Sequence, residues 1–239
     1  MTIIFCLIVA GAFFIQSLIG FGGGLIAVPL LSLFMPVKDV VTTLILFQIS
    51  MGLLVFKTHR DTNWSDVRKL IPAVVIGVML GLASLHYIPA NPMRLVLAGF
   101  IILYLLKTHT SFNLIKKLVD LGGVNLSGLL GGLMNAMIGG GAPAFVVYLK
   151  DRASNTAEFR ANITAILFIT NIPRVIGSVG TNMVNYDLTV LALTAYPGFL
   201  LALFLGQKFH GKIPKEVFSN FVTGILILSA VSLILKVFL

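Results

Sequence analysis

Long apolar stretches separated by short polar connections occupy almost the whole of this 239-residue chain. The chain is 58% hydrophobic and 10% charged, and its mean hydropathy is +1.03. A soluble domain of this size could not bury so much apolar surface, so we predict an all-α polytopic membrane protein. The apolar stretches lie near residues 3–19, 24–36, 40–56, 70–85, 92–106, 121–149, 161–179, 188–207 and 216–235.

The net charge of the chain is +9 at neutral pH. In a soluble protein this charge would suggest nucleic acid as a partner. Here the basic residues lie in the short connections between apolar stretches, where the positive-inside rule explains them. We therefore expect a lipid bilayer around the protein and no nucleic-acid partner.

The two halves of the chain share a pattern of glycines and prolines, which indicates a tandem duplication. The run Gly22 to Gly24 recurs 117 positions later at Gly139 to Gly141. Because the repeat uses the first residues of the chain, we expect residues 1–12 to be retained rather than cleaved as a signal peptide. Five further matches are 125 positions apart: Pro72 and Pro197, Gly81 and Gly206, Ile88 and Ile213, Pro89 and Pro214, and Gly99 and Gly224.

Lysine and arginine are distributed with opposite bias in the two halves. In the first half, the connection 57–69 holds four basic residues, whereas the connections around Lys38 and Arg94 hold one each. In the second half, two connections hold three each, and Arg174 stands alone between them. Inverted repeats produce this reversal, and inversion requires an odd number of crossings in each half. With that topology, thirteen basic residues lie on one side of the membrane and four on the other.

The predicted fold is therefore two tandem inverted repeats in one membrane domain, with both termini outside. Each repeat consists of a glycine-broken, re-entrant helical hairpin and three transmembrane helices. The first repeat covers residues 1–108 and opens with the hairpin 3–36. A linker at 109–120 follows, and the second repeat, 121–239, opens with the hairpin 121–149.

The two glycine runs predict an anion-binding site. Backbone that leaves the helix at membrane depth is tolerated only where protein buries it or where it lines a cavity. Each run precedes a half-helix, whose N-terminus presents free N–H groups and a partial positive charge. The alternative is that the glycines only allow close helix packing. The predicted substrate contacts are Gly22, Gly23, Gly24, Gly139, Gly140 and Gly141.

Four polar residues within or beside the apolar stretches extend this predicted substrate-binding site. Arg174 stands well inside an apolar run, which makes it a candidate for function, although snorkelling to the interface would also explain it. Gln48 lies where the 125-residue offset places Pro173, one residue from the counterpart of Arg174. Asn135 and Asn171 are neutral amides near the second glycine run. Hydrogen bonding between helices is the alternative role for each amide.

The sequence contains no pattern typical of an enzyme or a metal site. We find no Ser-His-Asp, His-Glu-x-x-His or P-loop pattern, and the four histidines show no metal-ligand spacing. We therefore expect no enzymatic activity, no metal and no cofactor. No acidic residue falls in the middle of a predicted span, so coupling to a proton or sodium ion is compatible with the sequence but is not marked by a buried carboxylate.

The paired motifs GFGGGLIAVPLL and IGGGAPAFVVYL resemble those of the sulfite exporter TauE/SafE family of membrane transporters. The resemblance covers nearly the whole chain. It implies movement of a small sulfur-containing anion, such as sulfite, a sulfonate or sulfoacetate, across the cytoplasmic membrane without ATP. It places the first motif on Gly20, Gly22, Gly23, Gly24 and Pro29, and the second on Gly139, Gly140, Gly141 and Pro143.

The second motif departs from the first at two positions. Met137 stands opposite Gly20, and Val146 stands opposite Pro29, so the two half-sites need not contribute equally. The family is commonly drawn with eight crossing helices, whereas the charge distribution predicts that two of them are re-entrant.

The predicted function is that of a secondary transporter with its substrate near the membrane midplane, between the half-helix N-termini. Two alternatives stay open. A passive anion channel would use the same positive helix ends, and a membrane-embedded partner or assembly protein would use the glycines for packing. A homodimer is compatible with each of the three.

Overall fold

The fold is entirely helical in the part of the chain that the structure, a computed structural model, describes. That part comprises residues 2–19, 22–52, 60–109, 114–150, 152–209 and 215–238. The helices are α1 (Thr2–Ile19), α2 (Gly23–Leu31), α3 (Val37–Met51), α5 (Trp64–Tyr87), α6 (Ala90–His109), α7 (Leu114–Ile138), α8 (Ala142–Lys150), α9 (Thr156–Gly180), α10 (Tyr186–Lys208) and α11 (Lys215–Phe238).

The helices present apolar side chains to their surroundings as well as to the core. Ile76 and Met79 of α5 and Leu201 and Phe204 of α10 are more than half exposed. A soluble protein does not expose apolar surface on this scale, whereas a lipid bilayer favours it. Four described segments are long and apolar enough to cross a membrane, which confirms the predicted all-α polytopic membrane protein. They are Trp64–Tyr87, Leu121–Ile138, Thr156–Gly180 and Tyr186–Lys208.

Both glycine runs interrupt helical structure where the sequence predicts a break. Gly22 has φ +100° just before α2, and Gly139 has φ +63° between α7 and α8. Glycine adopts this left-handed conformation without the steric cost that a side chain would bring. The helices α2 and α8 have nine residues each. Nine residues span about 14 Å, roughly half of a 30 Å hydrocarbon core, so these helices have the length of half-helices.

Every residue of the predicted linker at 109–120 that the structure describes is helical, and residues 110–113 lie outside the described part of the chain. The helix α6 ends at His109, and α7 already begins at Leu114. Gly123, with φ +56°, separates this first segment of α7 from the apolar segment that follows. The glycine kink, rather than the end of a loop, therefore marks where the long apolar part of α7 begins.

Asparagine caps define where three of the long helices begin. Asn63 accepts a hydrogen bond from the backbone N–H of Asp66 at the start of α5, and Asn155 does so from Glu158 at the start of α9. Asn185 caps α10 through the N–H of Leu188. A side-chain oxygen in this position satisfies a backbone donor that has no partner within the helix. The corresponding helices α5 and α10 therefore both begin with an asparagine N-cap.

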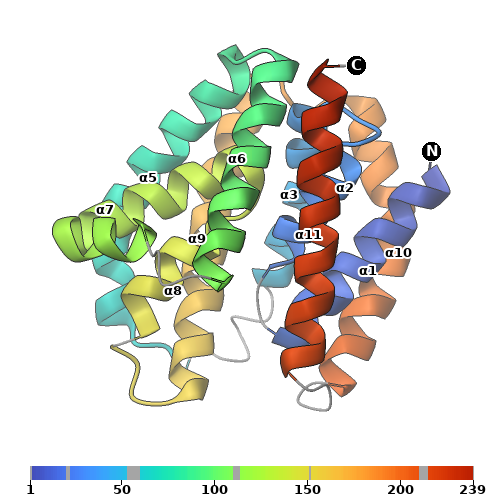
Figure 1. Cartoon of the computed structure of the whole chain (residues 1–239). Coiled ribbons are helices and arrows are strands. Elements are labelled where there is room, and N and C mark those ends of the chain that lie inside the picture. The colour runs from blue at the N-terminus through green and yellow to red at the C-terminus, as the bar shows by residue number, and fades with distance from the viewer. Residues whose placement is uncertain are drawn as a thin grey trace.

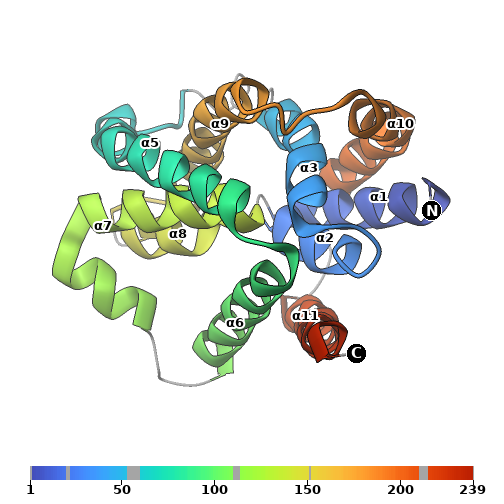
Figure 2. The same cartoon turned by 90° about the horizontal axis from the view of Figure 1, so that it is seen from above.

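One of the two lobes of the fold contains helices from both halves of the sequence, and so does the other. Figures 1 and 2 show one lobe made of α1, α2, α3, α10 and α11 and a second lobe made of α5 to α9. The helix α5 packs along α7, and its counterpart α10 packs along α1, the counterpart of α7. The counterparts α6 and α11 pack against each other, as do α3 and α9. This pairing is what a two-fold relation between the halves produces.

Corresponding helices also run in opposite directions. In Figure 1, α5 ends at the upper edge, where α6 begins. The counterpart of α5, α10, begins at that edge, and the counterpart of α6, α11, ends there at the C-terminus. Opposite directions are what inverted repeats require. The side of the membrane that each edge faces stays a prediction, and cysteine labelling tests it.

We expect cysteines at the two edges of the bundle to react from opposite sides of the membrane. The connection between α8 and α9 lies at the lower edge, and the connection between α9 and α10 lies at the upper edge. The first connection contains Arg152, and the second contains Thr181. In a Cys6→Ser background, Thr181→Cys should react with an impermeant maleimide in intact cells, and Arg152→Cys only after lysis. Labelling of both positions in intact cells would contradict this topology.

Candidate functional site

A cavity of about 350 Å³ lies between residues of both lobes. Its mouth is formed by the exposed residues Asp61, Ala157 and Gln207. Seven of the ten predicted site residues line it: Gly22, Gly24, Gln48, Asn135, Gly139, Gly140 and Asn171. The other lining residues are Gln16, Ser17, Leu25, Met51, Gly52, Ala142, Arg160, Thr164, Leu167 and Phe168.

The deep end of the cavity is formed by buried amides. Gln48 of α3, Asn135 of α7 and Asn171 of α9 are each less than a tenth exposed. Beyond them, toward the upper edge, Leu44 and Ser178 continue the same helices α3 and α9 and are fully buried. The cavity therefore opens at the lower edge, where α9 begins, and ends in the interior.

The two half-helices begin beside this cavity. Gly22 and Gly24 line it at the start of α2, and Gly139 and Gly140 line it just before α8. Gly23 and Gly141 do not line it. The N–H of Gly23 donates to Gln16 Oε1 at 3.0 Å, and a side chain at Gly141 would overlap the backbone of α7. Direct substrate contacts at these two positions stay a prediction.

The half-helix starts also approach each other closely. A Cβ atom at Gly24 would overlap the carbonyl oxygen of Gly139 and lie 2.7 Å from Gln48 Nε2. Only a residue without a side chain allows this approach of one backbone to another. The packing role and the cavity-lining role proposed for the glycines are therefore combined at Gly24.

We expect Gly24→Ala to destabilise the protein by about 1–3 kcal/mol, because the added methyl group has no space beside the Gly139 carbonyl. Thermal unfolding of the purified protein in detergent measures this change. Gly99→Ala in α6 is the matched control, because a Cβ atom there meets no atom within 4 Å. Equal melting temperatures for the two variants would contradict the packing.

Arg174 lies behind the amides and not on the cavity wall. Its side chain is fully buried, and Nη1 donates to Gln48 Oε1 at 2.5 Å and to Asn171 Oδ1 at 3.4 Å. Nη2 donates to the carbonyl oxygen of Val41 at 2.8 Å. The predicted snorkelling alternative is not what the structure has, because a snorkelling side chain would reach the surface. Its predicted direct contact with substrate stays untested.

The sequence was compared with known protein families. Residues 3–233 match the family described as Sulfite exporter TauE/SafE. The chain belongs to the TauE/SafE family. It is 26% identical over 237 residues to a Cupriavidus necator protein named "Probable sulfite/organosulfonate exporter TauE", with coverage of 95% of this chain and 90% of that protein. No solved structure matches the chain.

Membership of the TauE/SafE family confirms the resemblance carried by the two glycine motifs. Together with the apolar helices, it makes this chain a multi-pass membrane transporter for sulfur-containing anions, and it points away from an enzyme. Among the described residues, no group of three or more His, Cys, Asp or Glu could hold a metal ion.

Sequence reasoning missed several lining residues of this TauE/SafE cavity. Gln16 lines it from α1 and accepts the hydrogen bond from Gly23. A signal for it existed, because Gln16 precedes the first glycine run much as Asn135 precedes the second. Arg160 and Thr164 line the cavity from α9, one and two turns from the mouth residue Ala157. Nothing in the sequence distinguishes Arg160 from the other basic residues near helix ends.

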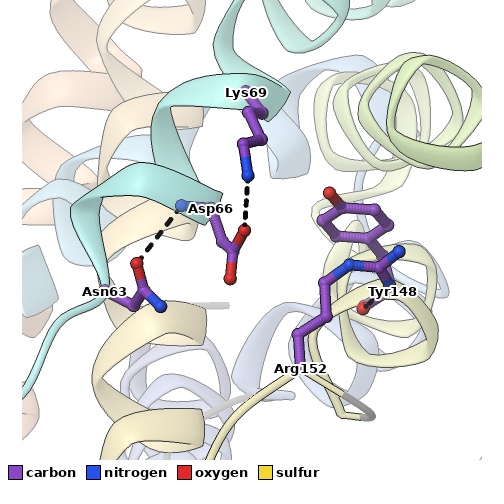
Figure 3. A network of polar contacts seen from close by, with 5 residues as sticks. All are labelled: Asn63, Asp66, Lys69, Tyr148 and Arg152. Carbon is purple, nitrogen blue, oxygen red and sulfur yellow. Dashed lines mark hydrogen bonds and ion pairs between the residues drawn. The ribbon is translucent and has the colours of Figure 1, made fainter.

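Polar contacts lie at helix ends near the mouth (Figure 3). Lys69 and Asp66 form an ion pair at 3.0 Å within α5, and the guanidinium of Arg152 lies 3.9 Å from the centre of the Tyr148 ring at the end of α8. The backbone N–H of Asn63 donates to Asn162 Oδ1 of α9 at 2.7 Å. This last contact joins the start of α5 to α9, two residues after the mouth residue Asp61.

Proposed function

We propose that this protein is a secondary transporter in the cytoplasmic membrane and that it binds a small sulfur-containing anion in the cavity described above. Sulfite, a simple sulfonate and sulfoacetate are the candidate substrates. The anion would lie at the deep end, between the starts of α2 and α8, and access would alternate between the two edges. The membership of the TauE/SafE family supports this assignment.

The observation that carries the proposal is the convergence of both half-helix starts on one buried, polar cavity end. Gly22 and Gly140 bring the two positive helix ends to it, and Gln48 and Asn171 add amide groups. Oriented N–H groups and helix N-termini favour anions. The described residues place no carboxylate at this end, since Asp61, at the mouth, is the acidic residue that lines the cavity.

The shape of the cavity favours a transporter over a channel. A channel needs a continuous water-filled path, whereas this cavity ends below the buried layer that contains Leu44, Arg174 and Ser178. The mouth lies at the edge where α5 and α9 begin and α10 ends. In the sequence, the basic residues Arg60, Arg68, Lys69, Arg152 and Lys208 stand at or beside these helix ends. By the positive-inside rule, this edge would face the cytoplasm, and the proposal therefore assigns the cavity to an inward-open state.

Transport by purified protein in liposomes tests the proposal. Liposomes preloaded with unlabelled sulfoacetate or sulfite should take up the labelled anion faster than empty ones, because a carrier returns more rapidly with substrate bound. Uptake should also saturate with concentration. Non-saturating flux that preloading does not accelerate would support the channel, and the absence of flux for every anion would support the partner protein.

A further inference from the structure

We propose that Arg174 sets the selectivity of the cavity for anions without touching the anion. In this role it is a positioning residue that holds the amide oxygens of Gln48 and Asn171, so that their NH2 groups face the ligand. The inference rests on the proposed function, because it concerns the same cavity.

Arg174 determines the orientation of both amides. A guanidinium group carries only hydrogen-bond donors, so an amide that faces it must present its oxygen. Nη1 of Arg174 lies 2.5 Å from Gln48 Oε1 and 3.4 Å from Asn171 Oδ1. Rotating either amide by 180° would bring N–H against N–H. The NH2 groups of Gln48 and Asn171 must therefore point away from Arg174.

The NH2 group of Asn171 has no hydrogen-bond partner among the described residues. The side chain is only 3% exposed and lines the cavity. Its oxygen is held from two sides, because Asn135 Nδ2 also donates to Asn171 Oδ1, at 3.1 Å. Because Asn171 lines the cavity and its nitrogen is accessible there, the donor can pair with a molecule inside the cavity. This donor therefore points to a ligand that supplies an acceptor.

The NH2 group of Gln48 is only weakly engaged. Nε2 lies 3.5 Å from the carbonyl oxygen of Gly139, which is the outer limit of a hydrogen bond. A shorter bond to an anion in the cavity would replace this contact at little cost. Gln48 and Asn171 thus supply donors from the two helices α3 and α9, which pack against each other.

The guanidinium group of Arg174 is separated from the cavity by the side chains of Gln48 and Asn171. It is anchored on the carbonyl oxygen of Val41 at 2.8 Å and does not line the cavity. An anion in contact with the amides is attracted by this charge but forms no ion pair with it. Such an arrangement favours groups that only accept hydrogen bonds, such as sulfonate and carboxylate, and allows their release.

Replacing the amides by carboxylates tests the inference. In Gln48→Glu the new carboxylate still accepts a hydrogen bond from Arg174. The substitution removes the NH2 donor of Gln48, and the negative charge neutralises the positive charge of the Arg174 guanidinium. Asn171→Asp makes the same change on α9. Arg174→Lys keeps the charge but cannot hold two oxygens in one geometry. The matched control is Asn91→Asp, because Asn91 accepts from Arg94 at 2.6 Å on the exposed part of α6.

The measurement is the melting temperature of each purified variant in detergent, with and without sulfoacetate or sulfite. We expect Gln48→Glu and Asn171→Asp to keep a ligand-free melting temperature within a few degrees of wild type. Their dissociation constant for the anion should rise at least tenfold. Arg174→Lys should also weaken binding at least tenfold, and Asn91→Asp should bind as wild type does.

Each remaining outcome overturns the inference in a recognisable way. Binding within threefold of wild type in Gln48→Glu and Asn171→Asp would show that their donors are not used, while the proposed function would stand. Wild-type binding by Arg174→Lys would show that charge alone matters. Loss of binding only in variants that melt at least 10 °C lower would assign the residues a merely structural role. No anion response in wild type would overturn the proposed function as well.

Discussion

Replacing Gly140 with leucine should abolish anion binding while leaving the protein folded. Gly140 lines the cavity just before α8, and its φ is not in the left-handed region, so a side chain is sterically accessible there. A new Cβ atom would lie 2.5 Å from Leu25 Cδ2, which is the end of a flexible side chain that can shift. The rest of the leucine would occupy space that the anion needs.

The melting temperature with and without ligand measures this effect. A ligand at 100 times its dissociation constant stabilises a protein by about 2.7 kcal/mol, and Gly140→Leu should lose that stabilisation. Gly99→Leu on α6 is the matched control, because no atom lies within 4 Å of its Cβ position. An undiminished anion response in Gly140→Leu would place the substrate elsewhere.

Replacing Arg174 with methionine should lower the stability of the protein by about 1–3 kcal/mol. Gln48 Oε1 would lose its donor, and the carbonyl oxygen of Val41 within α3 would lose its bond to Nη2. Asn171 Oδ1 would keep the hydrogen bond from Asn135 Nδ2. A buried acceptor left without a partner costs about 1–3 kcal/mol, and relief of the cost of burying the charge offsets part of this loss.

Thermal or denaturant unfolding in detergent measures the loss at Arg174. Lys69→Met provides the control, because Lys69 forms an exposed ion pair with Asp66, and exposed pairs contribute about 0–1 kcal/mol. A similar loss for the two variants would contradict the structural role given to Arg174. Because Arg174→Met is expected to be unstable, the selectivity of the cavity is better tested at Gln48 and Asn171.

The helix breaks could be predicted from the sequence because glycine runs are a local signal. The breaks before α2 and α8 need no tertiary information, since consecutive glycines destabilise a helix wherever they occur. The same signal indicates where α2 and α8 begin, but not where they end, at Leu31 and Lys150. The predicted inverted arrangement rests on loop charge, because loop charges indicate which side each connection faces.

The arrangement of the polar residues could be predicted only in part. Gln48, Asn135 and Asn171 are unusual in apolar stretches, which identified them as candidates. The contacts of Gln48 with Arg174 and of Asn135 with Asn171 could not be foreseen, because they join α3 and α7 to α9 across large sequence separations. Arg174 was predicted among the substrate contacts, whereas the structure places it one side chain behind the cavity wall.

The sequence by itself determined the membrane character and the places where helices must break. These properties depend on composition and on local backbone preference, which act without long-range contacts. Only the tertiary structure decided which glycines line the cavity and which pack, and which amide groups face a ligand. The physical reason is that the two halves exchange helices, so the environment of each residue is set by helices far away in the sequence.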